Sequence, residues 1–308
     1  MTSPTSSFAE DRRGLFYALA AYGIWGFLPI YIKALDHISA GEIFVHRIIW
    51  SLLFTGIALL LSRRHRLIWA HLSNPRTLLV LFGSTLFIAI NWLVFIWAAN
   101  SGRLLETSLG YYINPLVNIL CGLLFLGEKL RRMQWLAVAL ATAGVALQAI
   151  TLGSLPYVAL ILGFAFGLYG LLRKIIKVGA LEGLFIETLI LTPPSLLYLF
   201  YFSPGDSLAQ MANSFSFSLF LLCAGPLTSV PLMFFAAAVS RLNYSTMGFI
   251  QYIAPSTVLL TAVFWFGEVL VWQKIVTFVF IWSALALYSW DSWRRLKNYR
   301  LEAPEKSF

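Results

Sequence analysis

Residues 106–130 read ETSLGYYINPLVNILCGLLFLGEKL and residues 245–270 read STMGFIQYIAPSTVLLTAVFWFGEVL, and these two stretches are copies of one pattern. The positions that recur with constant spacing in the two copies are Tyr112, Ile113, Pro115, Gly127 and Glu128, matched by Tyr252, Ile253, Pro255, Gly267 and Glu268. Further matches lie upstream of each copy, where Ala21, Gly23, Gly26 and Lys33 correspond to Ala165, Gly167, Gly170 and Lys177. The chain therefore contains an internal duplication that spans most of its length.

The composition excludes an ordinary soluble domain. Hydrophobic residues make up 59% of the 308 residues, charged residues 11%, and the mean hydropathy is +0.79, whereas soluble domains carry roughly 25% charged residues. A helix needs about 20 apolar residues to cross the hydrocarbon of a membrane. Stretches of that kind occur at 14–35, 40–61, 77–99, 103–125, 131–150, 154–176, 181–202, 214–239, 244–266 and 270–290. The sequence therefore predicts an all-α membrane protein with ten transmembrane helices.

The duplication divides these predicted helices into two sets of five. A chain that crosses the membrane five times ends on the face opposite to its start, so the second copy must be inverted relative to the first. We therefore expect two inverted five-helix repeats between short tails. The predicted boundaries are 1–13 for a cytoplasmic N-terminal tail, 14–150 and 151–293 for the transmembrane repeats, and 294–308 for a cytoplasmic C-terminal tail.

The positions of Lys and Arg predict the orientation. If both termini are cytoplasmic, the basic runs at 63–66 and 294–297 fall in cytoplasmic segments, which are enriched in Lys and Arg. Of the 22 Lys and Arg, those left for the membrane or the opposite side are Lys33, Arg47, Arg103 and Lys274. This asymmetry predicts an N-in, C-in topology. It also argues against nucleic acid as a partner, because a nucleic-acid binder interleaves basic residues with polar surface.

The inverted duplication favours a transporter that carries a small-molecule substrate across the lipid bilayer. Many secondary transporters are built from inverted repeats and bind substrate near the midplane between them. We expect no enzyme activity, no catalytic residues, no cofactor and no metal site, since the sequence has no phosphate loop, metal-ligand spacing or nucleophile elbow. The alternative from another class is a membrane scaffold or receptor, which predicts a tightly packed centre without polar groups.

Four polar residues lie inside predicted spans, where each needs a partner, a cavity or a role. Glu42 and His46 are four residues apart and share one face of a helix, and Arg47 lies about 10 Å into the same helix. Arg47 either snorkels outward and is neutralised by Glu42, the interpretation that we prefer, or contacts substrate directly. Glu187 occupies the position of Arg47 in the second copy, so these residues are candidates for gates on opposite faces.

Candidate substrate-binding residues gather around Pro115 and Pro255. A proline removes a backbone donor and kinks a helix, and such helices at matching positions of two halves indicate a binding site, although both could be packing kinks. Amides and phenols beside large rings suit an amphipathic ligand with an apolar body and a polar head. The predicted lining residues are Trp25, Asn91, Trp92, Phe95, Tyr111, Tyr112, Asn114, Tyr169, Gln251, Tyr252 and Ser256.

Three runs carry a resemblance to a known family. They are AYGIWGFLPIYIK at 21–33, EIFVHRIIWS at 42–51 and NWLVFIWAANSGRLLETSLGYYINPL at 91–116. On these runs the chain resembles the drug/metabolite transporter (DMT) superfamily, EamA type, and within it the RarD-like proteins. The resemblance extends over nearly the whole chain. It implies inverted repeats around a central cavity and export of small metabolites across the bacterial inner membrane.

The resemblance also bears on substrate and coupling. The related YddG-like exporters of aromatic and other amino acids imply amino acids as the substrate class, while the link of RarD-type proteins to chloramphenicol sensitivity implies drug-like molecules as the alternative. Small multidrug proton antiporters of the same superfamily depend on a glutamate in the middle of their first helix. Residues 15–33 read LFYALAAYGIWGFLPIYIK and contain no acid. We therefore do not expect proton coupling by that mechanism, and facilitated diffusion or exchange stays open.

Overall fold

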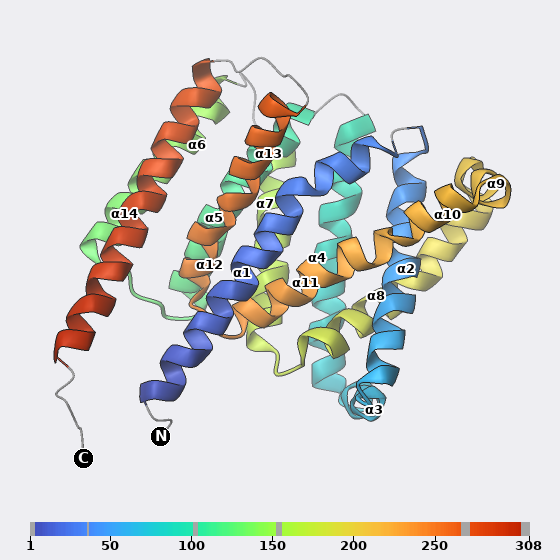
Figure 1. The fold of residues 1–308 in the computed structure, drawn as a ribbon, viewed down its shortest axis with the longest axis horizontal. Helices are drawn as coiled ribbons and strands as arrows, with labels where there is room; N and C mark the ends of the chain where they lie inside the picture. The colour runs from blue at the N-terminus through green and yellow to red at the C-terminus, as the bar shows by residue number, and fades with distance from the viewer. Residues whose placement is uncertain (1–3, 36, 101–103, 152–155, 266–271, 303–308) are drawn as a thin grey trace.

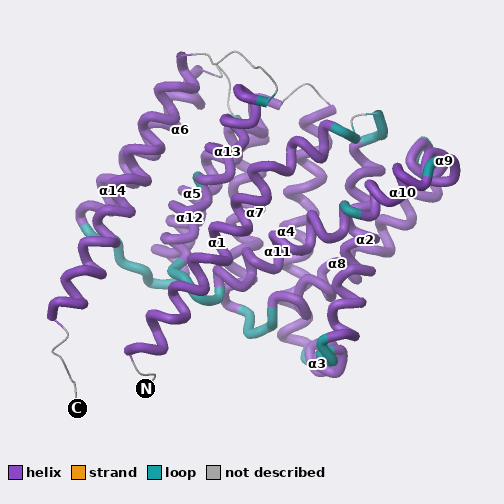
Figure 2. Tube along the Cα trace, in the orientation of Figure 1, coloured by secondary structure: helices purple, strands orange, loops and turns teal. Residues whose placement is uncertain are grey.

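The computed structural model describes residues 4–35, 37–100, 104–151, 156–265 and 272–302. Within these ranges every regular element is a helix, as Figures 1 and 2 show. The helices are α1 (Pro4–Lys33), α2 (Ala40–Leu61), α3 (His65–Leu72), α4 (Pro75–Asn100), α5 (Leu104–Phe125), α6 (Arg132–Thr151), α7 (Tyr157–Ile175), α8 (Ala180–Tyr201), α9 (Asp206–Asn213), α10 (Phe215–Leu222), α11 (Ala224–Val239), α12 (Tyr244–Gln251), α13 (Ile253–Phe264) and α14 (Trp272–Glu302).

Nine segments of the described residues are helical, long and apolar enough to cross a membrane. Each is a single helix except Phe215–Val239, which combines α10 and α11. These nine coincide with nine of the ten apolar stretches that the sequence contains. The chain is thus a multi-pass, all-helical membrane protein over the part that the structure describes.

The remaining apolar stretch, 244–266, contains two short helices in its described part instead of one continuous helix. Helix α12 ends at Gln251 and α13 begins at Ile253, with Tyr252 between them. Pro255 explains the break, because it has no N–H to donate to the carbonyl of Gln251 and its ring crowds that carbonyl. Each piece alone is shorter than the roughly 20 residues that a crossing needs.

The two longer connections of the chain each contain one short helix. Helix α3 follows α2, and α9 follows α8. The outermost long helices also continue past their apolar segments, since α1 begins at Pro4 and α14 runs to Glu302. These extensions carry the polar sequences of the two ends of the chain.

The helices of the two halves of the chain are interleaved. Helices α6 and α14 pack together at one edge of the molecule, and α9 and α10 lie at the other edge (Figure 1). Between them α1 packs against α11 and α13, α7 packs against α4 and α5, and α2 packs against α8 and α11. Helix α5 also packs against α12. The halves therefore share one helical bundle and do not form two separate domains.

The repeated motif joins α5 to α12. These helices cross closely because Gly248 has no side chain, and a Cβ there would lie 2.5 Å from the carbonyl oxygen of Pro115. Near the same crossing, the Glu128 carboxylate accepts hydrogen bonds from the backbone N–H groups of Tyr244 (2.6 Å) and Ser245 (2.8 Å). These two donors begin α12 and have no partner within the helix. The glutamate of the first copy thus caps the helix that carries the second.

Candidate functional site

Helices α2 and α8 carry charged side chains at the same two positions. Both helices have 22 residues and they pack against each other. Glu42 and Glu182 are their third residues, and Arg47 and Glu187 are their eighth. The three glutamates are buried and Arg47 is partly buried. Charged groups at membrane depth are costly unless they are paired or have a function, so their partners identify what each one does.

Glu42 joins the start of α2 to the segment that follows α8. Its carboxylate accepts hydrogen bonds from the hydroxyls of Ser203 (2.7 Å) and Ser207 (2.8 Å) and from the backbone N–H of Ser207 (3.2 Å). His46 Nε2 lies 3.1 Å from the same Ser207 hydroxyl. Glu42 and His46 therefore lie on one side of the helix and contact the same partner segment.

Glu182 makes the corresponding connection in the other direction. It lies in the first turn of α8, and one of its carboxylate oxygens lies 2.7 Å from Nε of Arg64. Arg64 belongs to the turn between α2 and α3. Each of the two helices is thus held at its start to the segment that follows the end of the other.

Glu187 lies in a buried polar network between α8, α7 and α4. Its carboxylate accepts hydrogen bonds from the hydroxyls of Ser84 (2.6 Å) and Tyr169 (3.4 Å). Nη1 of Arg173 lies 3.7 Å from the same carboxylate, and Arg173 Nε and Nη1 have no hydrogen-bond partner among the residues that the structure describes. Glu187 and Arg173 are both at most 2% exposed. They form a loose buried ion pair, whose members depend on each other for charge compensation.

Arg47 has a hydroxyl and an aromatic ring for neighbours. Its Nε donates a hydrogen bond to the Thr228 hydroxyl on α11 (2.9 Å), and its guanidinium carbon lies 5.1 Å from the centre of the Trp92 ring on α4. Among the residues that the structure describes, no ion pair between Arg47 and a carboxylate is found. Glu42, the counter-charge that the sequence suggested, bonds to serines instead.

Trp25 and Tyr169 belong to one aromatic cluster where α1, α7 and α11 meet. The ring of Trp25 lies 5.7 Å from that of Phe166 and 5.9 Å from that of Phe235. Tyr169 stacks on Phe235 at 5.9 Å. Phe235 is fully buried and touches all of the other rings, so this cluster brings residues of both halves together.

The prediction for Tyr112, Gln251 and Tyr252 placed them at a cavity, and the structure places them in packed surroundings. Tyr252 is fully buried and donates a hydrogen bond to the backbone carbonyl of Tyr112 (3.2 Å). Gln251 Oε1 accepts a hydrogen bond from Nδ2 of Asn118 (2.5 Å). These contacts hold α5 against the end of α12. The two tyrosines at equivalent positions of the repeat contact each other directly.

The surroundings of Pro115 differ from those of Pro255. Helix α5 continues through Pro115, whereas the helix before Pro255 is interrupted. Asn114 is buried and its Oδ1 has no hydrogen-bond partner in the described part of the chain. Ser256 accepts a hydrogen bond from Nε1 of Trp282 on α14 (2.9 Å). The two proline motifs therefore differ in backbone geometry.

Asn91, Phe95 and Tyr111 lie on α4 and α5. Nδ2 of Asn91 donates a hydrogen bond to the backbone carbonyl of Leu162 on α7 (2.9 Å). The rings of Phe95 and Tyr111 meet edge to face at 6.3 Å, and Tyr111 is 51% exposed. Tyr111 is also an electrostatic neighbour of Arg47. Of the predicted lining residues, Tyr111 is the one with an exposed side chain, and it lies one turn before Pro115 on α5.

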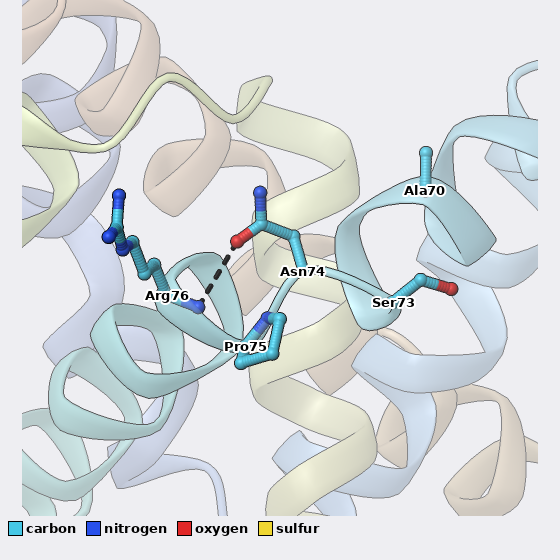
Figure 3. Close-up of a pocket in the computed structure, with 5 residues that line it drawn as sticks. All are labelled: Ala70, Ser73, Asn74, Pro75 and Arg76. Carbon is cyan, nitrogen blue, oxygen red and sulfur yellow. Dashed lines mark hydrogen bonds between the residues drawn. The ribbon is translucent and has the colours of Figure 1, made fainter.

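A hollow on the surface lies apart from all of these residues. Figure 3 shows it at the turn between α3 and α4, and its lining residues are Ala70, Ser73, Asn74, Pro75 and Arg76. There Oδ1 of Asn74 accepts a hydrogen bond from the backbone N–H of Arg76 (3.1 Å) and so caps α4. None of the predicted site residues lines this hollow.

The sequence alone does not identify several side chains that complete the site. Arg173 reads as a cytoplasmic charge because it lies near the end of a predicted span, yet it is buried beside Glu187. Ser84 and Thr228 each begin a pair of adjacent hydroxyl residues, Ser84-Thr85 and Thr228-Ser229, within long apolar stretches, which is the signal that could have drawn attention to them. Phe235 carries no such signal, since it is one of 25 phenylalanines.

Comparison with known sequences gives consistent matches. Residues 12–150 match the pattern of the EamA-like transporter family. A Pseudomonas aeruginosa protein named as an uncharacterized transporter is 50% identical over 94% of this chain and 97% of its own length. Protein RarD of Escherichia coli is 47% identical over 92% of this chain and 96% of its own. A chloramphenicol-sensitive protein RarD of P. aeruginosa is 30% identical over 93% and 96%.

A solved crystal structure shares the fold. It superposes with a TM-score of 0.70 at 19% identity and covers 98% of this chain and all of its own. At that identity the likeness concerns the arrangement of helices alone. The similar proteins thus agree with one another in length and in class, and their names are those of membrane transport proteins where a class is given.

Proposed function

The chain belongs to the EamA-like transporter family of the DMT superfamily, and from that premise we propose that it exports amino acids and similar amphipathic metabolites. Its substrates are small molecules and its setting is the lipid bilayer. In this proposal the protein lies in the bacterial inner membrane with both termini in the cytoplasm. Two inverted halves rock around a shared central site and expose it to each side in turn.

One observation carries the proposal. The eighth residues of α2 and α8 are both charged, and each forms a hydrogen bond with a hydroxyl on a helix of the opposite half. Arg47 binds Thr228 on α11, and Glu187 binds Ser84 on α4. Two charged contacts between the halves, at equivalent depths of inverted helices, are what gates on opposite faces require. Either contact can open while the other holds the halves together.

The helix contacts support the inversion. If α1 and α7 are equivalent, as are α2 and α8, α4 and α11, and α5 and the α12–α13 pair, then contacts should occur in matched sets. The contact of α1 with α11 corresponds to that of α7 with α4, and α2 with α11 corresponds to α8 with α4. Likewise, α1 with α13 corresponds to α7 with α5. The Glu42 and Glu182 connections are related in the same way.

The direct test is flux through the purified protein in proteoliposomes. We expect saturable uptake of radiolabelled phenylalanine and leucine above that of protein-free liposomes, with competition by other amino acids. Repeating the assay with and without a pH gradient determines whether protons are coupled. Trp25→Ala should lower the flux about 10-fold or more, because Trp25 is a partly buried ring of the central aromatic cluster. Trp135→Ala is the matched control, since Trp135 is 51% exposed on α6.

The alternatives predict different results in the same assay. Flux of chloramphenicol without flux of any amino acid would make the protein an exporter of drug-like molecules. The absence of flux with either class, in liposomes that contain folded protein, would contradict transport and favour a scaffold or receptor. Equal losses of flux for Trp25→Ala and Trp135→Ala would show that the central aromatic cluster does not line the substrate path.

A further inference from the structure

Several arginines of the described chain form ion pairs with a carboxylate, and Arg47 does not. The ion pairs found there are Arg13–Glu10, Arg64–Glu182, Arg131–Asp291, Arg173–Glu187 and Arg241–Glu10. Arg47 lies about 10 Å along α2 from its first residue, where an uncompensated charge is costly. A bound ligand that carries a negative charge would offset this energetic cost.

The guanidinium is also oriented for an anion. An arginine side chain has five N–H donors, and Nε of Arg47 is committed to Thr228. The two terminal nitrogens form no hydrogen bond with any residue that the structure describes. That end of the fork can bind a carboxylate with two parallel hydrogen bonds. Thr228 thus fixes the guanidinium and leaves its carboxylate-binding edge available.

Aromatic side chains lie near this guanidinium. Trp92 lies under the guanidinium at 5.1 Å, and Phe44 packs edge to face against Trp92 at 5.6 Å. Tyr31 and Tyr111 are electrostatic neighbours of Arg47. Tyr111 is half exposed. An anion held by Arg47 would therefore have rings beside it for an apolar body.

No carboxylate beside Arg47 is available to bind an ammonium in the described part of the chain. In an α-amino acid a single carbon separates the carboxylate from the ammonium, so an acid that bound the ammonium would lie beside the guanidinium. Among the described residues, no carboxylate oxygen lies within 4 Å of Arg47. Glu42, one turn earlier on the same helix, is occupied by the hydroxyls of Ser203 and Ser207. The charged group that the site offers to a zwitterion is thus the arginine, which pairs with the carboxylate end.

We propose that Arg47 binds the carboxylate of the transported molecule, and that the site takes hydrophobic monocarboxylates whether or not they carry an ammonium group. This inference rests on the proposed transport function and narrows its substrate class. Amino acids are then substrates because of their carboxylate and apolar side chain. Molecules that keep the ammonium but lack the carboxylate are excluded.

Two probes separate these features: N-acetylphenylalanine keeps the carboxylate and lacks the ammonium, and phenylalaninamide does the reverse. We would measure their binding to purified protein by calorimetry, which does not depend on flux. We expect the acid to bind and the amide to bind much more weakly. Arg47→Gln should weaken binding of the acid by about 30-fold or more and leave binding of the amide unchanged.

Further variants keep the test decisive if Arg47→Gln does not fold. Arg47→Lys retains the charge without the two-pronged geometry and should lose an intermediate amount of affinity for N-acetylphenylalanine. Thr228→Val retains Arg47 and removes the hydroxyl that orients it, for an expected loss of about 5-fold. Arg76→Gln is the matched control, because Arg76 is exposed at the start of α4, and it should bind as the wild type does.

Two results would overturn the inference. One is a wild-type protein that binds phenylalaninamide as well as N-acetylphenylalanine, or that binds neither. The other is unchanged binding of the acid in Arg47→Gln, or in both Arg47→Lys and Thr228→Val. Binding of the acid without flux in proteoliposomes would preserve the carboxylate site and contradict the transport function on which the proposal was built.

Discussion

Replacing Arg173 by glutamine is expected to destabilise the protein by about 3–5 kcal/mol, because it leaves the Glu187 carboxylate buried without a counter-charge. The two side chains are 1% and 3% exposed and lie 3.7 Å apart. The hydroxyls of Ser84 and Tyr169 would remain as hydrogen-bond donors to Glu187. Two neutral donors cannot replace a positive charge at that depth. Thermal and denaturant unfolding in detergent would measure the loss.

The double variant Arg173→Gln/Glu187→Gln makes this prediction specific. Removing both charges removes the need for compensation, so the double variant should recover most of the stability that the single variant loses. Arg76→Gln is the control for the loss of an exposed arginine, with an expected effect within about 0.5 kcal/mol. If Arg173→Gln were no less stable than Arg76→Gln, the buried pair would have no structural importance.

Gly248→Val is the second substitution with a large expected effect. A Cβ at this position would lie 2.5 Å from the carbonyl oxygen of Pro115 and 2.9 Å from Cγ1 of Ile119. The first of these atoms is backbone and cannot turn aside, so α5 and α12 would have to separate. Overpacking of this kind costs about 1–3 kcal/mol or more. We expect a lower unfolding temperature and loss of transport, since this crossing joins the two copies of the repeated motif.

Gly23 provides the matched control for this substitution. It lies within α1, and a Cβ added there meets no atom within 4 Å. Gly23→Ala should therefore leave stability unchanged or raise it by up to about 1 kcal/mol, as expected when a helical glycine is replaced by alanine. A Gly248→Val protein that unfolds at the same temperature as wild type would show that α5 and α12 do not cross as closely as described.

The spans could be predicted from sequence because the signal is local. Hydropathy over about 20 residues places nine of the apolar stretches on helices that match them. The matching positions of Arg47 and Glu187 along α2 and α8 followed from counting residues. The break at Tyr252 was harder to predict. Pro115 and Pro255 are equivalent in sequence, yet α5 continues through Pro115 while the helix is interrupted before Pro255. A proline makes a break possible, and the surrounding packing decides whether it occurs.

The partners in the site could not be predicted because they come from distant parts of the chain. Thr228 reaches Arg47 only after α11 has crossed α2, and Ser84 reaches Glu187 only because α4 packs against α8. The same limit explains Tyr112. Its sequence places it beside a proline on a membrane helix, but not on a particular face of that helix, and the structure turns it toward the core.

The measurement that tests alternating access most directly is the reactivity of a cysteine at position 111 from each side of the membrane. Tyr111 is 51% exposed and lies near Arg47. We would place Tyr111→Cys in a chain whose native cysteines are replaced by Cys121→Ala and Cys223→Ser, and apply a membrane-impermeant thiol reagent to either face. The account predicts labelling from both faces, with substrate shifting the ratio between them. Labelling from one face alone, with and without substrate, would contradict it.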